Sequence, residues 1–499
     1  MGAGPTGLVL ALWLTRLGIR VRIVDKAAEA GTTSRALAVQ ARTLEFYRQI
    51  GLAEEVVERG RIVTDANFWV RGRKSAHMVF GELGKGISPY PFPLIFPQDQ
   101  HEQLLVDRLA DEGIQVERQV EFLSYREVES GIIALLRGPD GHESECEASY
   151  LAGCDGAHSA VRKALGIGFA GGTYAHMFYV ADIDAEGEAA NGELHVGLDK
   201  NEFLAVFPLK KPGRLRLVGT IKDDSKLEHE SLAWEDVSRR VLNWMPIEVK
   251  NVNWFSSYRV HHRVAERFQK GRAFILGDAG HVHSPVGGQG MNTGIGDAVN
   301  LAWKLADVLR GRAAFSLVES YQAERIAFAQ QLVVTTDQAF TGVISPSPIA
   351  RFVRLHLIPL IVPIAIKLAA VRRLMFRTVS QANVNYRFSL VSQGRAGAIY
   401  GGDRLPWVPD NFAPLRSLTW QIHVYGQAPA WMSDLVPVHE FPWTQEARKA
   451  GLCQNALYLV RPDGYVAFAD PEPTAAKLTA YLDSRKIHLA GSSGDRRSS

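Results

Sequence analysis

The fold is decided by the stretch GAGPTG at residues 2–7, followed by LVLALWLTRL at 8–17 and IRVRIVD at 19–25. The glycines allow a backbone to approach a pyrophosphate closely, and the apolar run has the length of a helix that ends at Gly18. The alternating β-branched residues predict a strand ending at Asp25, whose carboxylate can accept the hydroxyls of an adenosine ribose. A glycine-rich turn with a surface aspartate is the alternative. We favour the start of a dinucleotide-binding α/β fold.

One part of that fold is missing from the sequence, because only Met1 precedes the glycine turn. In a doubly wound sheet this turn follows a central strand that pairs on both sides. Without that strand, its two neighbours would leave backbone donors and acceptors unpaired. We therefore expect either that the natural chain starts upstream of Met1 or that the chain is a degraded copy that binds no dinucleotide.

A second segment, CDGAHSAVR at residues 154–162, follows the apolar run SYLAG. It places Asp155 and Gly156 at the end of a predicted strand, and Arg162 on the helix that follows. Asp155 can then reach a bound cofactor, while Arg162 can screen a pyrophosphate or pair with Asp155. The alternative is that Asp155 caps the helix and forms a structural ion pair.

A third segment, GDAGHVHSPVGGQGMN at residues 277–292, follows a buried-strand pattern. Asp278 ends the strand, Pro285 and the glycines at 287–290 form a loop with few side chains, and a helix starts at Met291 and Asn292. Free N–H groups at such a helix end stabilise negative charge by about 0.3 to 2 kcal/mol. A pyrophosphate would repel Asp278, so we assign this carboxylate to a sugar-like hydroxyl. Three such segments in this order predict one shared site.

Composition narrows the class of protein. The chain has 499 residues, room for two or three domains, and 22% charged residues with a net charge of +3, which favours a small-molecule ligand over nucleic acid. Cys146, Cys154 and Cys453 form no CxxC and no metal-ligand spacing. We therefore expect a cytoplasmic protein without a disulfide framework or a metal site.

The most membrane-like segment is LIPLIVPIAI at residues 357–366, which has basic residues on both sides. Ten apolar residues that include Pro359 and Pro363 are too few to span a bilayer, which requires about 20. We predict a buried helix and linker between domains, with no stable membrane insertion. A peripheral membrane contact through the basic flanks is the alternative.

Strand-like patterns from residue 171 to 263 predict an antiparallel sheet inserted into the nucleotide-binding fold. We expect the following domains: a nucleotide-binding domain without its first strand at 1–70, 97–170 and 266–340; a substrate-binding sheet domain at 71–96 and 171–265; a helical linker at 341–400; a separate C-terminal domain at 401–490; and a disordered tail at 491–499.

The three segments together resemble the pattern of the FAD-dependent aromatic hydroxylases, the single-component flavin monooxygenases similar to p-hydroxybenzoate hydroxylase and phenol hydroxylase. SRALAVQARTLEFYRQIGL at 34–52 and FPQDQHEQLL at 96–105 also resemble this family, and the match covers about residues 1–406. YGGDRLP at 400–406 with LVRPDGYVAF at 459–468 resembles the thioredoxin-like C-terminal domain of the phenol hydroxylase branch. The resemblance implies a Rossmann-like FAD-binding domain, an inserted antiparallel substrate domain and a thioredoxin-like domain. Cys453 is the only cysteine in the last of these, so we expect a structural role there, with a homodimer left open.

The resemblance also implies the cofactor site. It makes Gly2, Gly4 and Gly7 the pyrophosphate turn; Asp25 the ribose ligand; Lys26, Arg35, Gln98 and Val120 further FAD contacts; Asp155, Gly156 and Arg162 the motif shared by flavin and nicotinamide; Asp278 the ribityl ligand; and Pro285, Gly290, Met291 and Asn292 the lining of the isoalloxazine.

The resemblance implies a monooxygenase in which NADPH or NADH reduces FAD. The reduced flavin would form a C4a-hydroperoxyflavin with O2, which would hydroxylate a phenolic or polycyclic aromatic substrate. This step requires a pocket from which water is excluded. A flavin epoxidase, a Baeyer-Villiger-type oxygenase and a truncated, non-catalytic scaffold are the alternatives, and a flavin halogenase is disfavoured because no WxWxIP-like segment occurs. The catalytic residue stays unassigned. The candidates for a base that deprotonates a phenol are Tyr174, His176, His195, Tyr258, His261, His262, and the better placed His281 and His283.

Overall fold

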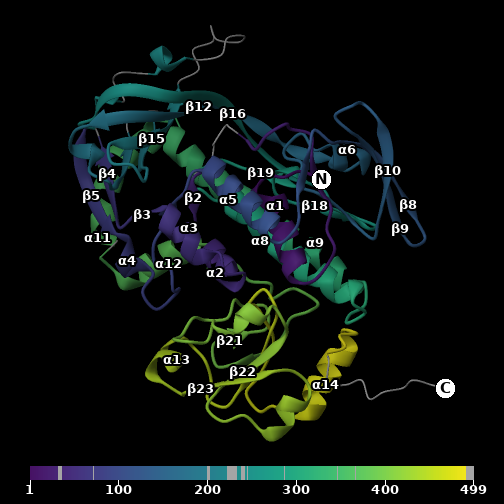
Figure 1. The fold of residues 1–499 in the computed structure, drawn as a ribbon. Coiled ribbons are helices and arrows are strands. Elements are labelled where there is room, and N and C mark those ends of the chain that lie inside the picture. The colour runs from purple at the N-terminus through teal and green to yellow at the C-terminus, as the bar shows by residue number, and fades with distance from the viewer. Residues whose placement is uncertain are drawn as a thin grey trace, which may run out of the picture.

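The computed structural model describes residues 1–31, 36–70, 72–198, 203–221, 233–237, 242–243, 245–285, 287–345, 347–365 and 367–489. It is a mixed α/β protein. Figure 1 shows the long strands β12 and β16 at the top, helices α1, α5, α8 and α9 in the middle, and the C-terminal part, in yellow-green, at the bottom.

The nucleotide-binding part begins with helix α1 (Pro5–Arg16), which starts directly after the glycine turn, and strand β1 (Ile23–Asp25). The strand predicted over 19–25 is thus shorter than its sequence pattern. The other elements of this part are β2 (Ala38–Val39), α2 (Ala41–Gln49), α3 (Ala53–Arg59), β3 (Arg61–Ile62), β6 (Leu94–Ile95), α5 (Gln98–Asp111), β7 (Val116–Arg118), β8 (Glu121–Val128), β9 (Gly131–Arg137), β10 (Glu143–Ala148), β11 (Leu151–Gly153), α6 (Ala160–Ala164), β17 (Gln269–Lys270), β18 (Ala273–Ile275), η3 (Gly277–Ala279), α8 (Gly290–Leu309) and α9 (Ser316–Ile344).

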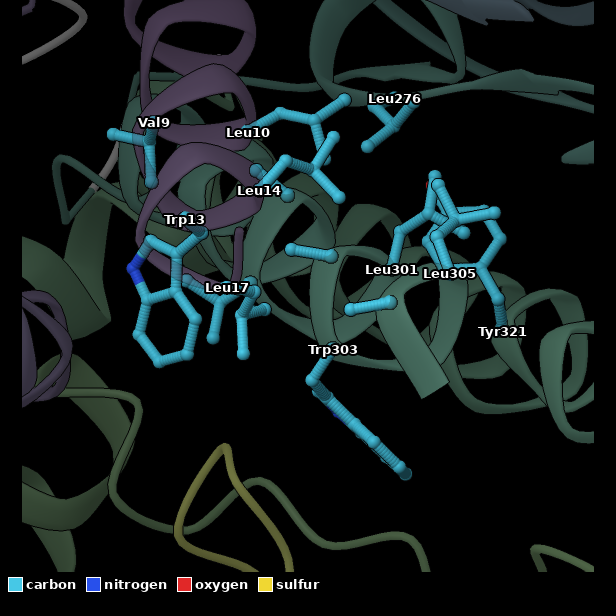
Figure 2. Packing of buried hydrophobic residues seen from close by; sticks show 14 of the residues in the cluster. Val9, Leu10, Trp13, Leu14, Leu17, Leu276, Leu301, Trp303, Leu305 and Tyr321 are labelled. Carbon is cyan, nitrogen blue, oxygen red and sulfur yellow. The ribbon is translucent and has the colours of Figure 1, made fainter. Parts of the chain in front are cut away.

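The core of this part lies between α1 and α8. Leu8, Val9, Leu12 and Trp13 of α1 are almost fully buried, and burial of each such side chain stabilises the fold by about 1.5 to 3 kcal/mol. Figure 2 shows side chains of α1 directed toward those of α8, while Trp303 of α8 points the other way, toward the C-terminal chain. α8 therefore packs on two sides.

The parallel sheet of this part is divided into two pieces. β1 pairs with β7, and β11 pairs with β18, but no strand of the described chain lies between β1 and β11. Only Met1 and Gly2 bridge the gap: Gly2 donates to the carbonyl of Val24 at 2.8 Å, and the N-terminal amine of Met1 donates to that of Ala152 at 2.8 Å. A slot of about 600 Å³ remains, lined by residues 20–24 and 148–152 and by α1.

The inserted sheet has eight strands in the order β19-β16-β12-β15-β14-β13-β4-β5. Its two longest strands, β12 (Phe169–Glu186) and β16 (Glu248–Ala265), pair antiparallel along most of their length. The other members are β4 (Asp65–Val70), β5 (Arg73–Val79), β13 (Leu194–Leu198), β14 (Phe203–Pro208), β15 (Arg214–Ile221) and β19 (His281–Val282), and short helices α4 (Phe80–Leu83), η1 (Glu188–Ala190) and η2 (Trp234–Asp236) accompany them.

Helices connect α9 of the nucleotide-binding part to the C-terminal domain: α10 (Pro348–Phe352), η4 (Val353–Leu357), α11 (Ile358–Ala365) and α12 (Ala369–Val379). The predicted burial of this segment is wrong for its outer face, because Leu360, Ile361 and Ile364 are 66%, 56% and 67% exposed. No helix in the described parts of the chain is long and apolar enough to cross a bilayer.

The C-terminal domain contains a six-stranded sheet in the order β21-β20-β25-β24-β22-β23. Its elements are β20 (Gln393–Ala396), β21 (Ile399–Tyr400), η5 (Pro414–Ser417), β22 (Gln421–Tyr425), η6 (Ala430–Asp434), β23 (Val438–Phe441), α13 (Gln445–Lys449), β24 (Leu457–Val460), β25 (Val466–Asp470) and α14 (Ala475–Ser484). A thioredoxin-like origin of this domain stays a prediction.

Buried charges join this domain to α8 and α9. The Glu324 carboxylate of α9 accepts hydrogen bonds from Arg461 at 2.8 and 3.0 Å and from Lys304 at 2.9 Å, and all three side chains are fully buried. Trp303 donates its indole N–H to Asp463, which also pairs with Arg461. Removing one partner of such a set leaves an uncompensated buried charge, so these contacts fix the domain on the helices.

Candidate cofactor site

The three glycine-containing segments meet in the structure. Cys154 donates its backbone N–H to the carbonyl of Met1 at 2.7 Å, which joins the second segment to the first. A Cβ placed on Gly277 would lie 2.6 Å from the hydroxyl oxygen of Thr6, so the third segment also touches the first. β11 and β18, which lead into the second and third segments, are paired neighbours. Three stretches that are far apart in the sequence therefore surround the N-terminus of α1.

The glycines of the first turn have two different functions. A Cβ on Gly2 would collide with the carbonyl of Cys154, and one on Gly7 with the carbonyl of Gly2, so these two glycines are required by protein packing. A Cβ on Gly4 would meet no described atom within 4 Å. Gly4 is also the N-cap of α1, and no side chain caps that helix end. Pro5 has no N–H, so the N–H groups of Thr6 and Gly7 in the first turn of α1 are the ones suited to an anionic group.

The Asp25 carboxylate lies beside this turn, at the end of β1. One oxygen accepts a hydrogen bond from the N–H of Ala3 at 2.6 Å and the other from that of Ala27 at 2.8 Å, and Arg118 is 4.0 Å away. Asp25 therefore fixes the turn against β1. A carboxylate oxygen can accept more than one hydrogen bond, so the ribose contact stays a prediction.

Asp155 and Arg162 of the second segment bind protein groups, Asp155 in the helix-capping role that was its alternative, and their cofactor contacts stay predictions. The Asp155 carboxylate accepts from the Ser159 hydroxyl at 2.5 Å and from the N–H groups of Ala160 and Val161, which caps α6. The guanidinium of Arg162 donates to the carbonyls of Ala279 and Ala157, 2.8 and 2.9 Å away. Arg162 is 5% exposed and thus ties the second segment to the third, where the sequence predicted a pyrophosphate contact or a pair with Asp155.

Asn292 fixes the loop of the third segment. Its side-chain oxygen accepts from the N–H of Gln40 and the hydroxyl of Thr43, and its amide nitrogen donates to the carbonyls of Ala38 and Gly288. The loop is therefore attached to β2 and α2. Among the other predicted contacts here, Pro285 is half-buried in the loop, Gly290 and Met291 are half-buried at the start of α8, and Asp278 is exposed in η3.

A buried ionic network supports this loop from below. Asp297 of α8 accepts from the N–H of Gly277 at 3.0 Å and lies 2.8 Å from Nε2 of His281 and 2.5 Å from Nε of Arg325. Burial alone would raise the pKa of Asp297, but Arg325 and His281 lower it, so the carboxylate is charged at neutral pH. His281 is consequently a structural partner, which removes one of the two better-placed candidates for the catalytic base.

His283, the second of those candidates, is also unsuited to that role. Its Nδ1 lies 2.8 Å from the carbonyl of Ser284, and burial followed by the nearby His281 lowers its pKa to about 4. Its Nε2 is buried without a partner in the described protein, and a Cβ on Gly290 would lie 3.8 Å from it. The imidazole is neutral at pH 7 and presents a polar atom next to the start of α8.

The remaining predicted contacts lie at the edge of the site or outside the described chain. Gln98 accepts from the N–H of Ala36 and donates to Glu102, and the N–H of Val120 donates to the carbonyl of Asp25. Lys26 follows β1 and is exposed. Arg35 lies outside the described residues, as does the side chain of His176.

Aromatic side chains on one face of the inserted sheet form a small buried cluster: Tyr174, Phe178 and Val260, with Tyr258 packed against them. Tyr174 lies against the ring of His262, with centroids 4.7 Å apart. Burial, and then a hydrogen bond to Asp337 of α9, raise the pKa of Tyr174, so its phenol is protonated at neutral pH. Because α9 packs on β16, this cluster lies on the side of the sheet that faces the nucleotide-binding part.

The other candidate bases have structural partners. His195 is 1% exposed, accepts from the indole of Trp69 at Nδ1 and lies 2.9 Å from the side-chain oxygen of Asn191. His261 lies 2.7 Å from the hydroxyl of Thr173. Phe178, Val260 and Asp337 were not predicted from the sequence. The alternation of apolar residues along β12 and β16 was the one pattern that could have indicated the cluster. The pairing register of these strands shifts between Thr173 and Met177, so the pattern alone does not show which residues are neighbours.

One group of potential metal ligands occurs among the described residues. Donor atoms of Asp65, His77 and Glu193 lie within 4.8 Å of one another. His77 is 2.9 Å from Asp65, and Glu193 accepts from Asn67 and Asn191. Protein partners therefore satisfy these donors, and we assign them no metal.

The residues at the meeting point fit FAD. The space beside Gly4 leaves room for the cofactor. The N-terminus of α1, which no side chain caps, offers N–H groups to an anion. Nε2 of His283, which has no partner in the described protein, offers a polar contact beside Gly290. The family described as FAD binding domain matches residues 1–336. The chain belongs to the FAD-dependent aromatic hydroxylase family, and it is an FAD-dependent monooxygenase by that membership.

Particular relatives share large parts of the chain. A 6-methylpretetramide 4-monooxygenase of Streptomyces rimosus is 39% identical over 68% of this chain and 60% of its own length. A flavin-dependent monooxygenase of Mycobacteroides abscessus is 31% identical over 93% of this chain and 95% of its own. Among solved structures, OxyS anhydrotetracycline hydroxylase from Streptomyces rimosus superposes with a TM-score of 0.78 at 27% identity, covering 98% of both chains.

Proposed function

We propose that this protein uses NADPH or NADH and O2 to hydroxylate a phenolic or polycyclic aromatic compound. The observation that carries the proposal is the convergence of the three segments on the N-terminus of α1. Relatives named for 6-methylpretetramide and for anhydrotetracycline favour a substrate of several fused rings. The three cysteines are free thiols, which supports a reducing cytoplasm as the location.

FAD, when bound, supplies the electron transfer and the oxygen chemistry. The chain's part is to hold and shield it. The N–H groups of Thr6 and Gly7 would hold the pyrophosphate, and the first turn of α8 at Gly290 and Met291 would lie at the ring. Asn292, through its four hydrogen bonds, keeps that turn in place.

The aromatic cluster on the inserted sheet is the proposed substrate wall. Phe178 and Val260 are 1% and 5% exposed, so the cluster provides apolar surroundings from which water is excluded. Tyr174, held protonated by burial and by Asp337, gives its one hydrogen to that carboxylate, so its oxygen can accept a hydrogen bond from the substrate but does not act as a base at neutral pH. We therefore assign Tyr174 to orienting a polar group of the substrate, and the base stays unassigned.

The purified protein's visible spectrum and its oxidation of NADPH and NADH test the proposal. We expect flavin absorbance and NAD(P)H oxidation that fused-ring phenols stimulate, with a product that has gained one oxygen as a ring hydroxyl. An epoxide or a ring-expanded lactone would replace this proposal with the epoxidase or Baeyer-Villiger alternative. A folded but colourless protein that does not take up added FAD would support the flavin-free scaffold.

A further inference from the structure

The helices before the C-terminal domain expose an apolar stripe. α10, η4 and α11 follow one another without interruption from Pro348 to Ala365. Their exposed apolar side chains recur at intervals of three or four residues, which places them on one face of the helical segment. They are Ile349 (76% exposed), Phe352 (56%), Val353 (37%), Leu357 (36%), Leu360 (66%), Ile361 (56%) and Ile364 (67%).

The other side of the same segment is in contact with the protein. Leu355 is 6% exposed, and α11 packs against β5 at the edge of the inserted sheet, where Figure 1 shows the two side by side. An amphipathic helix normally turns its apolar face inward, and soluble monomers rarely expose a continuous apolar surface of this kind. The stripe therefore marks an interaction surface.

The charges around the stripe select its partner. Residues 348–374 contain no aspartate or glutamate but five arginines and lysines. Arg351, Lys367 and Arg373 among them are exposed. If a second copy of the chain packed face to face on this surface, the arginines and lysines of the two copies would lie close together, and neither segment would supply a carboxylate. Electrostatic repulsion between these cations would oppose such a dimer. A surface that is both apolar and anionic would satisfy both properties of the segment.

We propose that residues 348–374 bind the surface of an anionic phospholipid bilayer. The apolar side chains would enter the boundary between headgroups and acyl chains, with the segment lying in the plane of the membrane. The long arginine and lysine side chains would extend to the lipid phosphates. The cytoplasmic leaflet carries such negative charge, and the proposal does not depend on the proposed reaction.

Co-sedimentation of the purified full-length protein with vesicles tests this proposal. We expect binding to vesicles that contain phosphatidylglycerol, weak binding to pure phosphatidylcholine, and loss of binding when salt rises from about 0.1 M to about 1 M, which shortens the Debye length from about 10 to about 3 Å. Ile361→Glu should lower the vesicle partition at least about tenfold, and the paired change Lys367→Gln with Arg373→Gln should lower it in phosphatidylglycerol vesicles only.

Val334→Glu is the matched control, because Val334 is 53% exposed on α9, outside residues 348–374. It should bind vesicles as the unchanged protein does. Equal loss in Ile361→Glu and Val334→Glu, or no sedimentation with anionic vesicles, would overturn the proposal. Self-association in the ultracentrifuge that Ile361→Glu abolishes, without vesicle binding by the unchanged protein, would assign the stripe to a second copy instead. Circular dichroism establishes that each variant is folded.

Discussion

At the scale of single residues, neighbouring glycines of one motif differ in what requires them. Gly2 and Gly7 have no Cβ because backbone atoms of the protein occupy that position. Gly4 has open space there and an ordinary extended backbone, φ −79° and ψ −179°, which any residue can adopt. Only a bound molecule would be affected by a side chain on Gly4.

Gly4→Ala should therefore lower FAD affinity at least about tenfold, or about 1.4 kcal/mol, while the free energy of unfolding of the apoprotein changes by about 1 kcal/mol or less. FAD titration followed by flavin fluorescence and urea unfolding measure the two quantities. Gly7→Ala is the contrast, since its Cβ meets backbone and should destabilise the protein itself by about 1 to 3 kcal/mol. Unchanged FAD affinity in Gly4→Ala would mean that the cofactor does not lie there.

A buried histidine on α5 makes stability depend on pH. His101 is 0% exposed, its Nε2 lies 2.7 Å from the hydroxyl of Tyr47, and burial lowers its pKa to about 3. The unfolded chain, with a histidine pKa of about 6.5, binds more protons than the folded chain between pH 3 and 6.5. Stability therefore falls as pH decreases through this window, by up to about 1.4 kcal/mol per pH unit for this residue.

His101→Gln should reduce that dependence. Urea unfolding between about pH 5 and about pH 6.5 should give a slope of stability against pH that is smaller, on average, by about 1 kcal/mol per unit than in the unchanged protein. His142→Gln, on the exposed turn between β9 and β10, controls for the loss of a histidine. If stability depends on pH with the same slope in the unchanged and His101→Gln proteins, the pKa of His101 is the same in the folded and the unfolded chain.

The contacts of single residues were the part least accessible from sequence. The glycine spacing predicted where the chain turns, because steric limits act on the backbone locally. The partners of Asp155 and Arg162 could not be predicted, since a carboxylate at a strand end can equally bind a ligand or cap the next helix. The aromatic cluster around Phe178 requires knowledge of strand register, which the sequence does not specify.

At the scale of elements, the slot between β1 and β11 is the main departure from a continuous sheet. The sequence predicts that a strand ahead of the glycine turn is missing from residues 1–499, and this stays a prediction. The exposure of α11 was not predictable in the same way. An apolar run of that length is equally compatible with a buried helix, and only its packing on β5 shows which face remains outside.

A short strand added ahead of Met1 should fill the slot. Five β-branched residues, at about 3.3 Å each, match the length of residues 20–24 on one wall and would pair with both β1 and β11. We expect thermal unfolding to shift upward by about 2 °C or more and the FAD content of the purified protein to rise. A glycine-serine extension of equal length is the control. If both extensions behave alike, the slot does not accept a strand.

At the scale of the whole molecule, one buried carboxylate joins two parts of the chain. Glu324 on α9 binds Lys304 on α8 and Arg461 in the C-terminal domain. Burial alone would raise the pKa of Glu324, but Arg461 and Lys304 lower it, and burial lowers the pKa of Lys304 to about 8. The depressed carboxyl pKa contributes stability that is complete above the unfolded value of about 4.3 and is lost as pH falls below it.

Glu324→Gln should destabilise the protein by about 3 to 5 kcal/mol, because the buried Lys304 would lose its carboxylate partner and Arg461 would keep only Asp463. Urea unfolding measures this loss, and the acid-induced decrease in stability should be smaller in the variant. Glu319→Gln, one turn earlier on the exposed face of α9, should change stability by about 0.5 kcal/mol or less. A similar loss in both variants would indicate a general effect on α9.

The absence of carboxylates from residues 338–402 has a consequence for enzymatic digestion. Trypsin, which cleaves after arginine and lysine, meets exposed Arg351, Lys367 and Arg373 in this segment, whereas a protease specific for glutamate finds no bond to cut there. The two enzymes should therefore give different first fragments. Trypsin should divide the chain between the nucleotide-binding part and the C-terminal domain, and lipid vesicles should protect these cleavage positions wherever the segment is embedded.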